Sequence, residues 1–209
     1  MTQDITPFVN SWLDEPVSLP EEPGIGRVAE LVIRAQGGDE AAFAAITAAS
    51  YGRLQQVAYR ILRDRHLAED ATQQALVNIW RKLPTLRDPA RFEAWSYRFL
   101  VNACSAEARR DGRSPRDLPF ARELVASDDV NVVLDRDQLE RGFERLTVDQ
   151  RAVIVLHHYL DLTLDDTATA LGISVGTVNS RLGRAMAKLR LALYVDRPTH
   201  EPVPEEVSG

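Results

Sequence analysis

The segment from Val175 to Leu189 of this 209-residue chain carries three cations and no acids. As a helix it would align one polar and basic flank, made of Thr177, Arg181, Arg184 and Lys188. Its outward ridge would hold only small residues, namely Gly176, Ser180, Gly183 and Ala187. Each glycine inside a helix costs about 1 kcal/mol relative to alanine, so a slim exposed ridge indicates close approach to a groove floor or a partner backbone. Cations beside such a ridge are typical of DNA recognition.

A helix-turn-helix would position this flank. Its first helix carries Leu164, Ala168 and Leu171 on one face, and Gly172 ends it because glycine tolerates the left-handed conformation that follows a helix. Ser174 is placed to accept a hydrogen bond from the free N–H groups of the second helix. The buried stripe of that second helix comprises Val175, Val178, Leu182, Ala185 and Leu189. The spacing therefore predicts a recognition helix packed on a shorter helix.

The N-terminal half is predicted to be helical throughout, from Arg27 to Arg110. The predicted helices break at Gly37 and Gly38, resume at the cap Asp39, run again from about Leu67 to Leu83, and start once more after Asp88. In the second half, Thr147 and Gln150 have the spacing of a capping box.

Acids and prolines concentrate at the two ends. Residues 1–26 and 194–209 hold seven of the eleven prolines and a net charge of −8, which leaves +2 on the body of the chain. Such segments are typical of chain that stays outside a packed core. The sequence predicts an all-α protein of two small helical domains joined by a flexible linker. The predicted parts are an acidic disordered extension at 1–26, a helical domain at 27–112, the linker at 113–136, the helix-turn-helix domain at 137–193 and an acidic disordered tail at 194–209.

Several function classes are excluded by composition. The single Cys104 rules out an intramolecular disulfide and a thiolate-rich zinc site, and it fits a cytoplasmic location. The longest aliphatic run, at 152–156, is too short to enter a membrane as a span. The neighbours His157 and His158 point about 100° apart on a helix, so they are unsuited to share a metal. No phosphate loop or nucleophile signature occurs, and we expect no catalytic residue, no metal and no cofactor.

Three segments in order resemble the extracytoplasmic-function (ECF) group of sigma factors of bacterial RNA polymerase. Residues 68–81 (AEDATQQALVNIWR) resemble the family's core-polymerase-binding helix, and residues 91–104 (RFEAWSYRFLVNAC) resemble its promoter-melting helix. Residues 146–185 resemble its fourth conserved region, which includes the helix-turn-helix. The resemblance covers roughly Arg27 to Leu193, and it implies a protein that directs core polymerase to promoters and assists their melting.

The resemblance also implies roles for individual residues. Those expected to face the clamp helices of the polymerase largest subunit are Asp70, Gln73 and Gln74. Those expected at the downstream promoter element are Trp95, Arg98, Asn102, Arg109 and Arg110. Those expected at the upstream element are Ser174, Thr177, Asn179, Ser180, Arg181, Arg184 and Lys188. Aromatic residues interleaved with arginine suit an unstacked base. Core packing is the alternative for Trp95, and it is favoured for Phe99.

The expected partners are core RNA polymerase, through its clamp helices and flap, promoter DNA and an anti-sigma protein. Two other functions remain open at this stage. A free-standing helix-turn-helix regulator would bind DNA alone, but it needs a sensing domain, usually with βαβ segments, and the N-terminal half shows helices only. A helical adaptor would bind neither DNA nor polymerase. The net charge of −6 is unfavourable for solitary DNA binding, which favours action together with polymerase.

Overall fold

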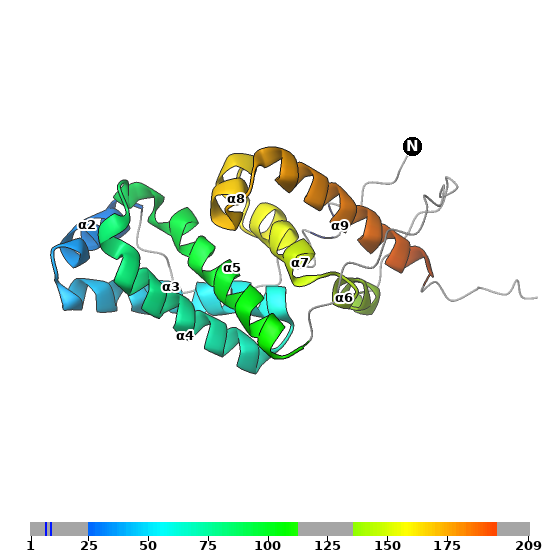
Figure 1. The fold of residues 1–209 in the computed structure, drawn as a ribbon, viewed down its shortest axis with the longest axis horizontal. Coiled ribbons are helices and arrows are strands. Elements are labelled where there is room, and N and C mark those ends of the chain that lie inside the picture. The colour runs from blue at the N-terminus through cyan, green and yellow to red at the C-terminus, as the bar shows by residue number, and fades with distance from the viewer. Residues whose placement is uncertain (1–6, 8, 10–24, 113–135, 196–209) are drawn as a thin grey trace, which may run out of the picture.

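The computed structural model describes Pro7, Val9 and residues 25–112 and 136–195, and these residues form two groups of helices with no strand among them. Helices α2 to α5 make the first group and α6 to α9 the second, and α8 leans against α5 where the groups meet (Figure 1). The two helical domains expected from the sequence are therefore both present. The predicted linker at 113–136 lies outside the described residues except for its last position, since Arg136 begins α6.

The first group is a bundle in which α3 and α4 pack against α5. Its helices are α2 (Ile25–Gln36), α3 (Glu40–Leu62), α4 (Arg65–Lys82) and α5 (Phe92–Arg110), with short 3₁₀ turns η1 (Leu83–Thr85) and η2 (Pro89–Arg91) between α4 and α5. Asp39 caps α3 as expected, because its side chain accepts a hydrogen bond from the Ala42 N–H. Asp64 caps α4 in the same way, so α4 starts two residues before the predicted Leu67.

The second group holds the helix-turn-helix. It consists of α6 (Arg136–Glu144), α7 (Val148–Ile154), a π-helical turn η3 (Val155–Tyr159), α8 (Leu164–Leu171) and α9 (Val175–Val195). The capping box of Thr147 and Gln150 forms as predicted. Gly172 ends α8 with a φ of 66°, the left-handed conformation that glycine tolerates best. The helix-turn-helix is confirmed in its order, its turn and its caps.

The π-helical turn was not anticipated, because the sequence was read there as a regular helix. It brings the rings of His157 and His158 to 4.9 Å between centroids, and His157 Nδ1 lies 2.8 Å from the carbonyl oxygen of Leu162. In the described part of the chain, no group of three or more His, Cys, Asp or Glu side chains is placed to hold a metal ion.

Two apolar clusters form the core, and they do not follow the division into helical groups. The first is built mainly from α2 to α5 but includes Val148, Ala152 and Ala170 of the second group. The second is built from α6 to α9. The two groups therefore share a continuous apolar contact.

Val9 corrects one expectation. The whole segment 1–26 was predicted to stay outside the fold, but Val9 is fully buried and belongs to the second core cluster, which also contains Phe143 and Leu189. The sequence did carry a signal, since the apolar residues around Val9 repeat at helical spacing: Ile5, Phe8, Val9, Trp12 and Leu13. The acids and prolines of the segment were given more weight than this pattern. The other residues of that extension, apart from the exposed Pro7 and the end of the segment in α2, lie outside the described residues, as does the tail beyond Val195.

Thr167 and Thr72 allow a test of what a buried hydroxyl without a hydrogen-bond partner costs in stability. Both are fully buried in helices, but the Thr72 hydroxyl donates to the Ala68 carbonyl at 2.7 Å, whereas the Thr167 hydroxyl has no partner. A buried hydroxyl without a partner costs about 1–3 kcal/mol, so Thr167→Val should raise the free energy of unfolding by about 1 kcal/mol. Thr72→Val should leave it unchanged or lower it. Urea denaturation followed by circular dichroism measures both, and equal effects of the two substitutions would contradict the assignment.

Candidate nucleic-acid interface

The first turn of α9 is held by side-chain hydroxyls. The Ser174 Oγ accepts from the Thr177 N–H at 3.2 Å and lies 2.8 Å from the Thr177 hydroxyl. The Ser180 hydroxyl donates to the Thr177 carbonyl at 3.0 Å. Ser174 therefore acts as the N-cap predicted from the sequence. Asn179 and Ser180 are exposed beside it, so the leading turns of the recognition helix present polar groups to solvent.

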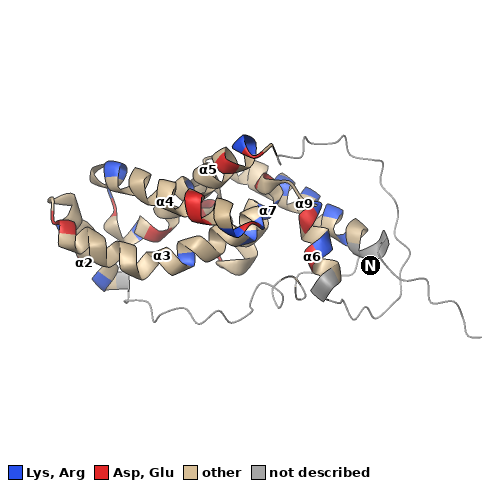
Figure 2. Ribbon diagram, turned by 90° about the horizontal axis from the view of Figure 1, so that it is seen from below, with Lys and Arg blue, Asp and Glu red and all other residues tan. Residues whose placement is uncertain are grey.

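The predicted cations of α9 are not equally available. Arg184 is exposed, and its Nε donates to the Ser180 carbonyl at 3.2 Å, which directs the guanidinium back toward the start of the helix. Arg181 is only 23% exposed and lies 3.4 Å from the Asp149 carboxylate of α7. Lys188 is half-buried. Arg184 is thus the most accessible of the three, and Figure 2 shows the basic residues along α9.

Gly176 and Gly183 are exposed, and a Cβ atom added at either would meet no other atom within 4 Å. Packing inside the protein therefore does not require glycine at these positions. The slim ridge predicted from the sequence is present, with open space in front of it.

Helix α5 carries the second set of predicted residues. Trp95 is half-buried, with its ring centroid 4.5 Å from that of Phe99 in an edge-on arrangement and 6.2 Å from that of Phe92. Both Trp95 and Phe99 pack against the first core cluster. Arg98 and Asn102 are exposed. The sequence left core packing and contact with a base as alternatives for Trp95. The structure is compatible with both, because one part of the ring is packed and another is accessible.

Two cations end α5. Arg109 and Arg110 are both exposed, and Arg110 Nη1 lies 2.9 Å from the Glu107 carboxylate. Glu107 is itself buried, with 7% of its side chain exposed. Arg110 thus satisfies a buried acid, while 72% of its own side chain stays in contact with solvent.

The predicted polymerase-binding residues Asp70, Gln73 and Gln74 are all exposed on α4. The same helix also exposes two large apolar side chains that sequence reasoning missed, Val77 at 44% and Trp80 at 39%. Asp70, Gln73, Val77 and Trp80 are spaced three or four residues apart, so they share one face. Below we call these four residues the α4 face. The sequence could have shown this face, because Val77 and Trp80 continue the helical spacing that begins with Asp70 and Gln73.

Comparison with known proteins accounts for both regions. Residues 47–114 match the family Sigma-70 region 2, and residues 136–189 match Sigma-70, region 4. The ECF RNA polymerase sigma factor SigM of Mycobacterium tuberculosis is 32% identical over 169 residues, which cover 80% of this chain and 86% of that protein. The chain belongs to the ECF RNA polymerase sigma factors. It is accordingly a sigma factor that directs RNA polymerase to promoters, and the resemblance noted in its sequence is confirmed.

Solved structures of sigma factors share the fold over both groups of helices. CnrH, solved in complex with the cytosolic domain of CnrY, has a TM-score of 0.60 and 27% identity, and the match covers 82% of this chain and 99% of CnrH. RpoE from Bartonella quintana, solved with the anti-sigma factor NepR, has a TM-score of 0.54 and 26% identity over 74% of this chain and 98% of RpoE. The all-α sigma-factor fold therefore extends over most of this chain. None of the helices in the described segments is long and apolar enough to cross a membrane.

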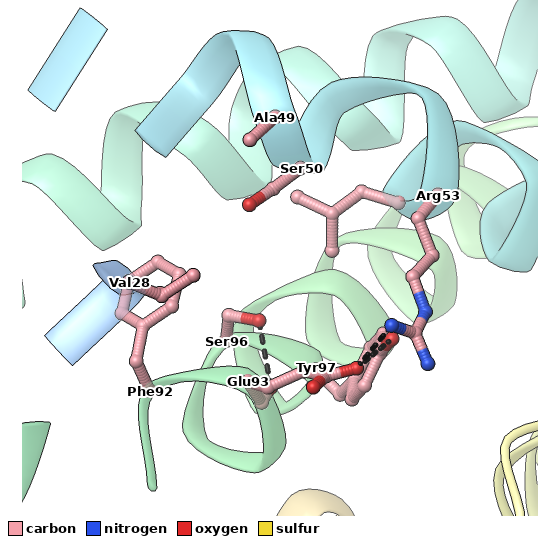
Figure 3. A pocket seen from close by; sticks show the side chains of 9 residues that line it. Val28, Ala49, Ser50, Arg53, Phe92, Glu93, Ser96 and Tyr97 are labelled. Carbon is pink, nitrogen blue, oxygen red and sulfur yellow. Dashed lines mark hydrogen bonds and ion pairs between the residues drawn. The ribbon is translucent and has the colours of Figure 1, made fainter. Parts of the chain in front are cut away.

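A cavity of about 60 Å³ lies between α2, α3 and the start of α5 in the sigma factor (Figure 3). Glu93 forms part of its wall and is held there by two contacts of its carboxylate, which accepts a hydrogen bond from the Tyr97 hydroxyl at 3.2 Å and pairs with Arg53 at 2.7 Å. At about 10–15 Å³ per water, the cavity has room for a few water molecules. The α5 residues that line it are Phe92, Glu93, Ser96 and Tyr97.

The cavity lies on the wrong side of α5 to serve the predicted downstream-element residues. At 3.6 residues per turn, Trp95, Arg98 and Asn102 project from the side of α5 opposite to those lining residues. We therefore assign the cavity no part in DNA binding.

Loss of the α9 cap should destabilise the recognition helix. Replacing an N-cap serine by alanine costs about 1 kcal/mol, so Ser174→Ala should lower the free energy of unfolding by that amount. Ser180→Ala is the matched control, because its hydroxyl bonds to a carbonyl that already lies within the helix, and it should change stability by less than about 0.5 kcal/mol. Thermal unfolding of the two variants beside the wild type measures the difference, which disappears if Ser174 does not act as a cap.

Proposed function

We propose that the two helical groups of this sigma factor divide promoter recognition between them. In this proposal, residues 27–112 hold core polymerase on the α4 face and handle the downstream promoter element on α5. Residues 137–193 read the upstream element with α9. The observation that carries the proposal is the exposure of the polar leading turns of α9 beside an open ridge of glycines.

Roles along α9 follow from position. The first turns of a recognition helix enter the major groove, so Thr177, Asn179 and Ser180 are assigned to base edges or to nearby backbone. Arg184 and Lys188 lie further along the helix and are assigned to phosphates. Arg181 is assigned a weaker phosphate contact, because its pairing with Asp149 competes with DNA. Ser174 supports the site by fixing the helix end.

The α4 face suits a protein partner. Protein interfaces combine an apolar centre, often aromatic, with a polar rim, and Val77 and Trp80 beside Asp70 and Gln73 have that composition. Trp80 is supported from below by Phe43, whose ring centroid lies 4.5 Å away. We propose that the clamp helices of the polymerase largest subunit bind here, with Gln74 at the rim, and that the flap contacts the second domain.

On α5, the exposed edge of Trp95 offers a stacking surface, and Arg98 and Asn102 offer hydrogen-bond donors next to it. Arg109 and Arg110 extend the positive charge toward the end of the helix. We assign these five residues to the downstream element.

Regulation by a protein is part of the same proposal. RpoE of Bartonella quintana was solved with an anti-sigma factor. By analogy we propose that an anti-sigma protein binds this chain, which acts in the cytoplasm and has no enzymatic activity of its own.

Charge reversal on the α4 face tests polymerase binding. Asp70→Arg should weaken binding to core polymerase at least tenfold, because it places a cation at the rim of the proposed interface. Glu69→Arg makes the same change one position away, on a side turned by about 100°, and should have little effect. Titration of labelled sigma factor with core enzyme measures both affinities. Equal binding by Asp70→Arg and the wild type would refute the assignment.

Two alanine substitutions on α9 test promoter reading. Asn179→Ala should cost roughly 1–3 kcal/mol at one base pair and relax specificity there, because a base-edge contact is lost. Lys188→Ala should weaken binding evenly across sequences and make the salt dependence shallower by about one ion. Binding of the polymerase complex to a promoter library at several salt concentrations measures both effects. If neither substitution alters use of the upstream element, the helix is structural.

A further inference from the structure

Helices α4 and α5 are joined by residues 83–91, which include the 3₁₀ turns η1 and η2. These residues are called the α4–α5 loop below. Leu83 and Leu86 are buried in the first core cluster, whereas Arg87 and Arg91 are exposed. The loop is therefore anchored to the bundle near its start, and it carries two cations at the surface just before α5 begins.

A side chain of α2 holds the anchored part of the loop. Gln36 is the last residue of α2, and its Nε2 donates to the Leu83 carbonyl at 3.0 Å and to the Leu86 carbonyl at 2.7 Å. An amide nitrogen carries two hydrogens, so each carbonyl receives one of them. Helix α2 also packs against η1 and η2, beside the start of α5 (Figure 1). Gln36 thus ties the end of α2 to a segment far along the chain.

The Leu86 carbonyl depends on Gln36 more than the Leu83 carbonyl does. The Leu83 carbonyl also accepts the Leu86 N–H at 3.1 Å, so it keeps a partner without Gln36. Leu86 follows η1 in an extended conformation, with φ −72° and ψ 112°. In the described part of the chain, Gln36 is the only group that bonds to its carbonyl. Because Leu86 is only 7% exposed, loss of Gln36 would leave this carbonyl poorly satisfied.

The start of α5 depends on the same loop. Arg91 stands at the N-cap position of α5 and forms no side-chain cap. The preceding turn is ordered by Asp88, whose side chain accepts from the Ala90 N–H at 3.1 Å and whose carbonyl accepts from the Arg91 N–H at 3.0 Å. Helix α5 therefore continues a turn that the loop has already formed, and a shift of the loop would shift the first turn of α5.

We propose that Gln36 is a positioning residue for the downstream promoter element. It acts through the α4–α5 loop, because fixing Leu86 sets the place of Arg87, of Arg91 and of Trp95 one turn further on. The inference rests on the proposed function of α5. The α4 face and the leading turns of α9 belong to other elements, and the Gln36 side chain donates only to the loop. Polymerase binding and upstream reading should therefore not depend on Gln36.

Substitutions that remove the two donors test the proposal. Gln36→Met has nearly the length of glutamine and no donor, and Gln36→Glu places a carboxylate against two carbonyl oxygens. Gln36→Lys keeps N–H donors at a similar reach and should retain most of the wild-type behaviour. Gln55→Met is the matched control, because Gln55 is a half-buried glutamine of α3 whose side chain bonds to no described residue. It should behave like the wild type.

Sequence selection by the polymerase holoenzyme is the decisive measurement. Holoenzyme containing each variant is given one promoter library with a randomised downstream element and another with a randomised upstream element. Discrimination among downstream sequences should fall about fivefold in Gln36→Met, the factor that one hydrogen bond is worth, and further in Gln36→Glu. Discrimination among upstream sequences and affinity for core polymerase should stay at the wild-type level. A purely structural residue would lower the active fraction for all sequences alike and leave both ratios unchanged.

Hydrogen exchange reports the order of the loop itself. The amides of Leu86 and Arg91 donate to the carbonyls of Leu83 and Asp88, and both should exchange several-fold faster in Gln36→Met than in the wild type. Unchanged downstream discrimination in Gln36→Met and Gln36→Glu would overturn the proposal, whether or not exchange is faster. An equal loss of discrimination at both promoter elements would overturn it as well.

Arg98→Ala separates this inference from the proposed function of α5. If Arg98→Ala keeps wild-type discrimination at the downstream element, the assignment of α5 to that element fails, whatever the Gln36 variants show. If Arg98→Ala loses discrimination while the Gln36 variants keep it, the assignment of α5 stands and the role of Gln36 fails. Loss at the downstream element alone in both kinds of variant supports both.

Discussion

The packing of α5 on two opposite sides constrains the rest of the structure. On its inner side, Tyr97, Leu100 and Cys104 are buried in the bundle with α3 and α4. This burial of large apolar side chains stabilises the bundle and fixes the rotation of the helix about its axis. Once the rotation of the helix is fixed, Trp95 and Arg98 must point away from the bundle. Because one helix serves as both core and contact surface, a change in its register would disturb stability and binding together.

The boundary between the two helical groups combines opposing contributions. Apolar residues from both groups share one cluster, and Tyr159 adds a hydrogen bond and a stacked arginine. Against these stands the cost of burying Arg60 and Arg151, because the Nε atom of each lacks a hydrogen-bond partner even though Arg60 stacks on the Tyr159 ring. A buried N–H group without a hydrogen-bond partner costs free energy, because it loses its bond to water and gains none in the protein. The boundary is therefore stabilised by the burial of apolar side chains and opposed by the two unsatisfied guanidinium nitrogen atoms.

Local signals were predicted well because they depend on neighbouring residues. Asp39, Gly172 and the pair of Thr147 and Gln150 each act within one helical turn, and each does in the structure what its residue type predicts. The exposed ridge of α9 was predicted for the same reason, since its spacing alone determines it.

Contacts between helices that are far apart in sequence were not predicted, because the spacing of residues within one helix does not show which distant residue will pack against it. The pairing of Arg181 with Asp149 joins two different helices, so its reduced exposure could not be read from the spacing of α9. The π-helical turn was missed because His157, His158 and Tyr159 fit a regular helix equally well. Packing of α8 on α5 joins segments far apart in the chain, and it decides how much of the downstream site is accessible.

The burial of Val9 has a consequence for how the chain is made and handled. Its core cluster includes Leu189, 180 residues further along the chain, so this part of the core can close only after α9 has left the ribosome. Until then, Val9 has no completed core to pack into, although all the helices of the first bundle have already been made. A substitution that removes the Val9 side chain would consequently loosen the group of helices that holds the helix-turn-helix, which lies far from it in sequence, rather than the first bundle, which follows it directly.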